Sequence, residues 1–89
     1  MSTRTPIELI LYERQDCCLC HDMLAVLERL QGEFALAIRR VDVATSRELE
    51  ERYGAEVPVL FVQGRKAFKY RVAEAELRRR LQREVRTSA

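Results

Sequence analysis

The sequence Cys17-Cys18-Leu19-Cys20 stands between the apolar run Ile7-Glu8-Leu9-Ile10-Leu11-Tyr12 and a segment with helical periodicity. Cys17 and Cys20 are three residues apart, so at the start of a helix they lie on one face of its first turn. Side chains placed in this way can form a disulfide with little backbone movement. The unpaired N–H groups and the positive dipole end of the helix stabilise a thiolate there. These features predict dithiol–disulfide exchange in a small redox protein.

The hydrophobic period changes several times along the chain, and a breaker residue stands at most of these changes. Residues 7–12 read as a buried strand, and residues 17–31 as a helix with Gly32 as its expected C-terminal cap. A second strand is expected over 34–43. It is followed by a short helix that begins at the capping box Thr45-Ser46-Arg47-Glu48 and stops at Gly54.

The last third of the chain predicts a hairpin and a helix. Strands are expected over 57–62 and 66–70, joined by the turn Gln63-Gly64, and an amphipathic helix over about 73–86. The predicted order is β-α-β-α-β-β-α, with the first two strands parallel and the hairpin as an antiparallel edge. By pattern, the predicted core includes Leu9, Leu11, Leu36, Ile38, Phe61 and Phe68.

Length and composition limit the kind of protein this chain can be. Its 89 residues predict one domain over 1–89, and no apolar run approaches the ~20 residues of a membrane helix. The first six residues lack the regions of a signal peptide, so we expect a cytoplasmic protein without a membrane partner. Thiols stay reduced in that compartment, so three cysteines within four residues suggest catalysis or metal binding over a structural disulfide.

The charge of the chain is unevenly distributed. Nine Lys/Arg stand against three Glu from Val62 onward, whereas residues 1–61 carry a net negative charge. One interpretation is a C-terminal surface for an anionic or acidic partner, and the other is a solvated helix face. Nucleic acid is not the expected partner.

The element order, with Cys17 and Cys20 after the first strand and Val57-Pro58 opening the third, resembles the thioredoxin fold, and its glutaredoxin-like branch in particular. The resemblance implies an α/β fold with a four-stranded mixed sheet and three helices. It implies a thiol–disulfide oxidoreductase in which Cys17 is the nucleophile and Cys20 the resolving thiol. It also implies that Pro58 is in cis, that Val57 pairs through its backbone with an extended substrate, and that Arg14 lies beside the nucleophile.

The same resemblance bears on partners and cofactors. The expected substrates are protein or low-molecular-weight disulfides, with glutathione or a thioredoxin reductase as electron donor and no bound cofactor or metal. Two features differ from the glutaredoxin pattern. The motif contains Cys18-Leu19 and not the Pro-Tyr of glutaredoxins or the Gly-Pro of thioredoxins. After the fourth strand, Tyr70-Arg71-Val72-Ala73-Glu74 stands in place of the Gly-Gly pair and nearby Asp with which glutaredoxins hold glutathione.

Other interpretations of the motif stay open. The two cysteines can be ordinary buried residues, Cys18 either an alternative resolving thiol or a tolerated small residue, and Arg14 a plain surface arginine. Cys17 to His21 also matches the C-x-x-C-H haem pattern, and a zinc or iron–sulfur site shared between two chains is a further hypothesis. A thioredoxin-fold adaptor without turnover is the main alternative function.

Overall fold

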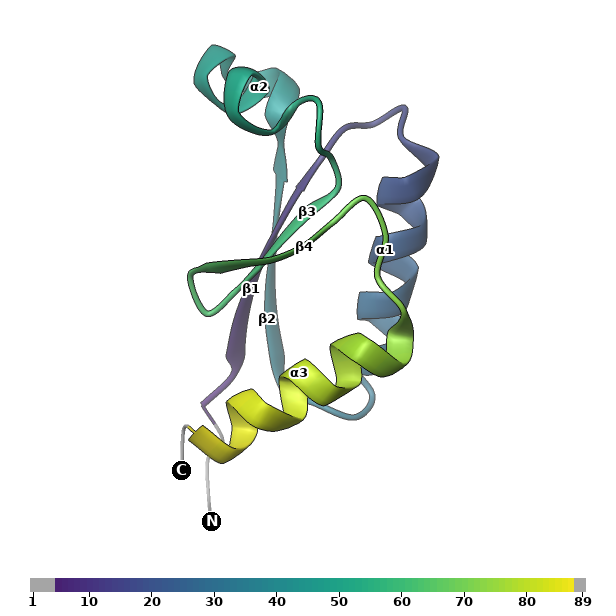
Figure 1. The fold of residues 1–89 in the computed structure, drawn as a ribbon, viewed down its shortest axis with the longest axis vertical. Coiled ribbons are helices and arrows are strands. Elements are labelled where there is room, and N and C mark those ends of the chain that lie inside the picture. Colours follow the sequence, from purple (N-terminus) through teal and green to yellow (C-terminus); the bar gives the residue numbers. More distant parts are fainter. Residues whose placement is uncertain (1–4, 88–89) are drawn as a thin grey trace.

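A four-stranded mixed sheet with strand order β2-β1-β3-β4 forms the centre of the molecule (Figure 1). The structure, a computed structural model, describes residues 5–87. The strands are β1 (Ile7–Glu13), β2 (Leu36–Asp42), β3 (Val59–Val62) and β4 (Arg65–Lys69). The helices are α1 (Cys18–Leu30), α2 (Arg47–Tyr53) and α3 (Glu74–Thr87), and the 3-10 turn η1 (Val43–Thr45) precedes α2.

The pairing of the strands follows from the connections between them. β1 and β2, joined through α1, are parallel, whereas β3 is antiparallel to both β1 and β4. The tight turn between β3 and β4 has positive φ at Gln63 (51°) and Gly64 (80°), the backbone that two-residue hairpins favour. The predicted α/β fold, the parallel pair and the antiparallel hairpin are therefore confirmed.

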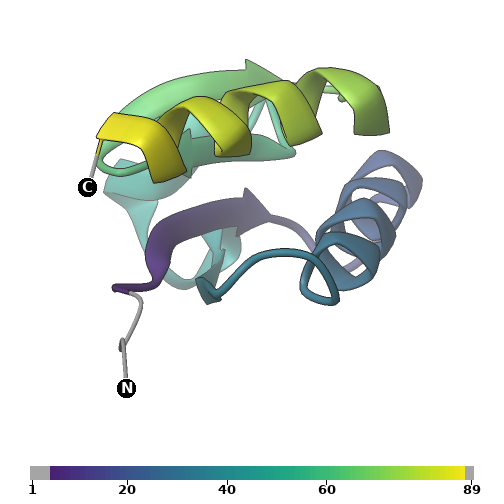
Figure 2. The same cartoon turned by 90° about the horizontal axis from the view of Figure 1, so that it is seen from below.

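Helices α1 and α3 pack against one face of the sheet. Alternate residues of β1 (Ile7, Leu9 and Leu11) are buried there. They join a cluster contributed by α1, β3 and α3: Met23, Val26, Leu27, Leu30, Leu60, Val62, Leu77 and Leu81. Figure 2 views α1 nearly along its axis and α3 lengthwise, so the two helices cross at a steep angle. Leu36, Ile38 and Phe68 are partly buried against this core, as predicted.

The prediction that Phe61 belongs to this core is wrong. Leu60 and Val62 face α1 and α3, so the intervening Phe61 must face the other side of the sheet. There its ring meets those of Tyr12 and Tyr53 edge-on, at centroid distances of 5.5 and 5.8 Å. Tyr12 and Tyr53 are themselves stacked at 4.4 Å. This aromatic cluster attaches α2 to the end of the sheet.

Two predicted helix caps also differ from the structure. Gln31 is the C-cap of α1. Beyond it, the Gly32 N–H donates to the Arg29 carbonyl and the Phe34 N–H donates to the Leu30 carbonyl. Gly32 is therefore not a left-handed cap. Helix α2 is capped by Ser46 rather than by Thr45, because the Ser46 hydroxyl accepts from the Leu49 N–H while the Thr45 hydroxyl donates to the Asp42 carbonyl.

Two points concern the extent of the chain. No helix within residues 5–87 has the length and hydropathy needed to span a membrane. The single domain over 1–89 stays a prediction, since residues 1–4 and 88–89 lie outside the described residues.

Candidate active site

Cys17 and Cys20 form a disulfide at the start of α1, with their Cα atoms 5.2 Å apart. Cys17 has extended backbone and is the N-cap of α1, so it stands at the junction between the β1–α1 loop and the helix. Cys20, in the first turn, is fully buried, whereas Cys17 is only half-buried. Of the two cysteines, Cys17 is therefore the more accessible from solvent.

The local electrostatics favour a negative charge on Cys17. The Cys20 backbone N–H donates to Cys17 Sγ at 3.1 Å, which satisfies one of the N–H groups that a helix start leaves unpaired. No acidic residue lies in the first turn of α1, although Asp16 directly precedes Cys17 in the loop. The backbone donor and the positive end of the helix dipole stabilise the thiolate form of a cysteine at an N-cap position.

Pro58 is brought to the same end of the sheet as the cysteines. The antiparallel register pairs Tyr12 with Val59, so the segment just before β3 lies beside the end of β1, from which the cysteine loop departs. The Val57–Pro58 peptide bond is cis, and Pro58 is buried. The Pro58 carbonyl accepts from the Tyr70 N–H at 2.9 Å. Within residues 5–87, the half-buried Val57 makes no backbone hydrogen bond to another residue.

Arg14 is held by α2, three residues before Cys17 in the chain. Its Nη1 donates to Glu50 Oε2 at 3.0 Å, and its Nη2 donates to Glu50 Oε1 and, at 2.9 Å, to the Gly54 carbonyl. The hydrogen bonds from Arg14 lower the pKa of the Glu50 carboxyl and, reciprocally, raise that of the guanidinium. Three of its five N–H groups are therefore occupied by α2 and its C-terminal end.

The other two polar residues of the motif are exposed. Cys18 is a free thiol on the surface, and His21 is exposed one residue after Cys20. His21 shares a small cavity of about 190 Å³ with Arg14 and the ion pair that Arg40 forms with Glu13 at 2.7 Å. In the part of the chain that the structure describes, no group of three or more His, Cys, Asp or Glu side chains could hold a metal ion.

A shallow groove of about 200 Å³ lies beside the motif, between α1 and the segment that follows β4. Leu19, Met23 and Val26 contribute its α1 side. The opposite side carries Tyr70, Arg71 and Val72, and Tyr70 is 42% exposed. The groove adjoins the cysteine motif through Leu19, the residue that precedes Cys20.

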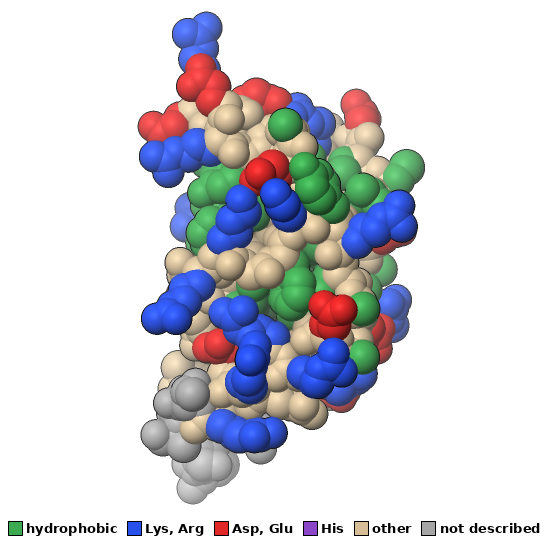
Figure 3. Space-filling view, in the orientation of Figure 1, with side chains coloured by type: hydrophobic (Ala, Val, Ile, Leu, Met, Phe, Trp, Pro, Cys, Tyr) green, Lys and Arg blue, Asp and Glu red, His purple; other side chains and the backbone are tan. Residues whose placement is uncertain are grey.

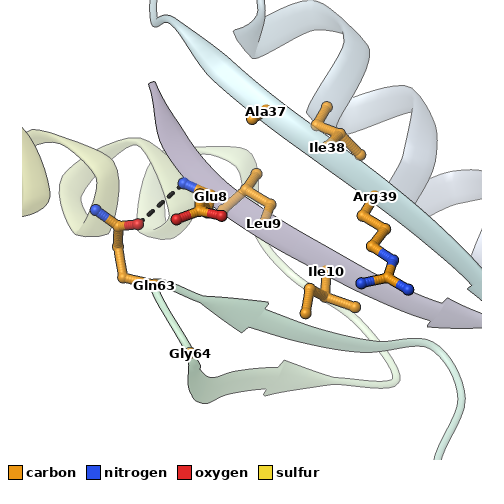
Figure 4. A pocket seen from close by; sticks show the side chains of 8 residues that line it. All are labelled: Glu8, Leu9, Ile10, Ala37, Ile38, Arg39, Gln63 and Gly64. Carbon is orange, nitrogen blue, oxygen red and sulfur yellow. Dashed lines mark hydrogen bonds between the residues drawn. The ribbon is translucent and has the colours of Figure 1, made fainter. Parts of the chain in front are cut away.

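A larger cavity, of about 500 Å³, is away from the cysteines, on the sheet face opposite α1 and α3 (Figure 4). Ile10 and Arg39 border it, and the Gln63 side chain accepts from the Glu8 N–H at 3.0 Å beside it. None of the predicted site residues lines this cavity. Its size alone therefore does not make it the functional site.

The positive charge predicted for the C-terminal part of the chain is visible as a scatter of lysine and arginine side chains over the lower half of the face in Figure 3. Several of these cations are already paired with carboxylates. Glu56 receives hydrogen bonds from Lys66 and Lys69, Glu33 and Glu74 from Arg78, and Glu84 from Arg80. Lys66, Lys69 and Arg78 therefore attach one element to another, whereas the pair of Arg80 with Glu84 lies within α3.

The sequence predicted that Pro58 lies near Cys17 and Cys20, but it did not predict the partners of Arg14. Glu50 and Gly54 follow Arg14 by 36 and 40 residues, and no local pattern links them. Gly54 was predicted from its position to end a short helix, and nothing in the sequence indicated that its carbonyl would contact an arginine. The contact between Tyr12 and Tyr53 is equally distant along the chain.

Fold and site together define a protein with the thioredoxin fold and a Cys-x-x-Cys pair at the start of its first helix. The family model of the glutaredoxin-like domain (DUF836) matches residues 8–82, and the chain belongs to this family. No curated protein matches it in a sequence comparison.

Solved structures agree with this assignment. The X-ray structure of the structural genomics target XcR50 from X. campestris is 33% identical, with a TM-score of 0.70 over 83% of this chain and 95% of that one. Protein Ne2328 from Nitrosomonas europaea, solved by NMR, is 25% identical, with a TM-score of 0.73 over 86% and 93% of the two chains. Thioredoxin 1 from Thermosipho africanus, 15% identical, shares the fold with a TM-score of 0.66 over 91% of this chain and 97% of its own.

Proposed function

We propose that this protein is a thiol–disulfide oxidoreductase that uses Cys17 as its nucleophile and Cys20 as its resolving thiol. The observation that carries the proposal is the Cys17–Cys20 disulfide at the start of α1, with the Cys20 N–H donating to Cys17 Sγ. Membership of a glutaredoxin-like family supports it.

The reaction proceeds in two exchanges. The Cys17 thiolate attacks one sulfur of the substrate disulfide, forming a mixed disulfide and releasing the other sulfur as a thiolate. The Cys20 thiolate then attacks Cys17 Sγ, which forms the Cys17–Cys20 disulfide and releases the second substrate thiolate. The substrate gains two electrons and two protons in total. A dithiol, or two molecules of a monothiol such as glutathione, then reduces the Cys17–Cys20 disulfide and restores the enzyme.

Residues around the cysteines provide a site for an extended substrate. Val57 has backbone groups available beside Pro58, so a substrate strand can pair with them next to the reacting sulfur. Leu19, Met23 and Tyr70 give the groove an apolar part that suits a hydrophobic side chain flanking the substrate cysteine, and Asp22 and Arg71 add one charge of each sign to its lining. Glutathione or a thioredoxin reductase is the proposed electron donor, in the cytoplasm.

A redox titration tests the proposal. The protein is equilibrated in buffers of defined glutathione or dithiothreitol potential, and its free thiols are counted by mass spectrometry. We expect a reversible two-electron transition near the ~−200 to −270 mV of glutaredoxins and thioredoxins, and no turnover by a Cys17→Ser variant. If all thiols stay free throughout the range, or if Cys17→Ser keeps full turnover, the proposal is wrong and a binding adaptor becomes the better assignment.

A further inference from the structure

Arg14 connects the β1–α1 loop with helix α2 and with the residue that ends this helix. It lies in the β1–α1 loop that leads to Cys17, whereas Glu50 lies in α2 and Gly54 at its end. The guanidinium contacts both oxygens of the Glu50 carboxylate and also the Gly54 carbonyl, at 2.9 Å. A bidentate contact of this kind fixes the orientation of a guanidinium as well as its position.

Gly54 provides an independent sign that this contact is built into the fold. Its φ of −54° is open to any residue, so the chain does not need glycine there for its backbone conformation. It needs glycine for space. A Cβ atom at position 54 would overlap first the backbone carbonyl and the carboxylate of Glu50, and it would also lie 2.9 Å from Arg14 Nη2. The missing side chain therefore leaves room both for the end of α2 and for the ion pair between Arg14 and Glu50.

The segment that Arg14 holds leads directly to Pro58. Only three residues separate Gly54 from Pro58, and a backbone hydrogen bond from Glu56 to the Tyr53 carbonyl, 2.8 Å long, keeps them close to α2. Across from them, Tyr12 of β1 pairs with Val59. Glu56 is also held to β4, by Lys66 and Lys69. The contact of Arg14 with Gly54 is therefore one of two attachments of the short segment that leads to the Val57–Pro58 peptide.

We propose that Arg14, Glu50 and Gly54 form a tether that sets the position of the Val57–Pro58 loop relative to Cys17, and through it the docking of the disulfide substrate. The inference rests on the proposed oxidoreductase function. Arg14 and Glu50 act in it as positioning residues, through the Val57–Pro58 loop. They take no electron and no proton during the exchange.

A second possible role of Arg14, stabilising the Cys17 thiolate by its charge, makes a different prediction. Removing the Glu50 carboxylate would then leave the Arg14 charge uncompensated and shift the ionisation of Cys17 to lower pH. The tether predicts the same defect whether Arg14 or Glu50 is changed, and no change in the ionisation of Cys17. The two roles can therefore be separated by experiment.

A double-mutant cycle provides that separation. Arg14→Gln, Glu50→Gln and the double variant are compared in the reduction of a peptide disulfide by dithiothreitol, and Cys17 ionisation is followed by the pH dependence of iodoacetamide alkylation. Each single change is expected to raise KM about tenfold with little change in kcat, because the displaced loop would bind substrate and transition state equally more weakly. The double variant is expected to lose no more than the worse single variant, with the alkylation midpoint unchanged.

Two further variants complete the test. Gly54→Ala, whose Cβ would overlap the carbonyl and carboxylate of Glu50 and crowd the Arg14 guanidinium, should reproduce the rise in KM. Glu51→Gln, a change at an exposed position of α2 next to Glu50, should leave KM unchanged. Additive losses in the double variant, a shifted alkylation midpoint, or an equal effect of Glu51→Gln would each overturn the tether.

Hydrogen exchange separates failure of the tether from failure of the proposed function. A wild-type protein without turnover would reject the oxidoreductase assignment alone. In that case the tether is decided by amide exchange of Tyr70, whose N–H donates to the Pro58 carbonyl. Faster exchange at Tyr70 in Glu50→Gln than in Glu51→Gln, with unchanged circular dichroism, supports the tether, and equal exchange in the two variants rejects it.

Discussion

The backbone N–H of Cys20 donates to Sγ of Cys17 at 3.1 Å, within the same turn that the disulfide closes. A main-chain donor stays in place when either side chain is replaced or reduced. The stabilisation of charge on Cys17 therefore depends on the helix and not on the Cys20 thiol. This agrees with the proposed reaction, in which Cys17 is the nucleophile and Cys20 only releases the product.

Cys20→Ser should trap the mixed disulfide between Cys17 and the substrate. The backbone donor to Cys17 remains, so the first exchange still occurs, but no thiol at position 20 releases the product. Intact-mass spectrometry after mixing with a peptide disulfide should show a single covalent adduct. Cys18→Ser, at the exposed free thiol, is the matched control and should keep turnover. Release of the adduct in Cys20→Ser would instead identify Cys18 as a resolving thiol.

Gly64→Ala should destabilise the protein by about 1 kcal/mol. Its φ is 80°, and no atom lies within 4 Å of the position that a Cβ would take, so the cost is conformational and not steric. Gly32→Ala is the comparison, because Gly32 lacks a positive φ and a Cβ there would make only an ordinary contact with the Arg29 carbonyl. Urea denaturation should show a loss for Gly64→Ala and none for Gly32→Ala. Equal losses would mean that the hairpin turn does not need its left-handed glycine.

Arg78→Gln should lower stability at neutral pH and have little effect in acid. The hydrogen bond from Arg78 lowers the pKa of Glu33. The pKa of Glu74 is also lowered, mainly by its hydrogen bond from Arg29 and to a lesser extent by the one from Arg78. Carboxyls with a lowered folded pKa contribute stability above their unfolded pKa, and this contribution is lost as the pH falls through the folded value. The difference in urea midpoint between wild type and Arg78→Gln should therefore be present at pH 7 and close below about pH 3.

Arg79→Gln serves as the control for this measurement. Arg79 is the exposed neighbour of Arg78 on α3, and it has no carboxylate partner within residues 5–87. Its replacement should leave the urea midpoint unchanged at both pH values. A gap between wild type and Arg78→Gln that persists in acid would show that the ion pairs with Glu33 and Glu74 are not its source.

The order of elements and the position of the cysteine pair could be predicted from the sequence because both depend on local patterns. The alternation in β1 and the helical spacing of Leu19, Met23 and Leu27 are fixed by backbone geometry over a few residues. A pair of cysteines three residues apart at a strand–helix junction needs no distant contact to be recognised. The same locality explains why the hairpin turn at Gln63 and Gly64 was predictable.

The finer features depended on contacts that have no local signature. The prediction that Phe61 belongs to the core was wrong because every residue of an apolar strand looks buried from its sequence. The placement of β3 in the sheet decides which of its side chains meet α1 and α3. The caps at Ser46 and Gln31 were each displaced by one residue from the predicted ones, since alternative hydrogen bonds compete at every helix end.

By itself, then, the sequence determined the succession of strands and helices and the cysteine pair at the start of α1, since a few neighbouring residues are enough to specify a period or a thiol spacing. Only the tertiary structure decided what surrounds that pair. The contacts of Arg14 with Glu50 and Gly54, and the placing of Pro58 beside the end of β1, join residues that are distant in the chain. Such contacts arise from packing of the completed sheet, and packing is a property of the whole fold.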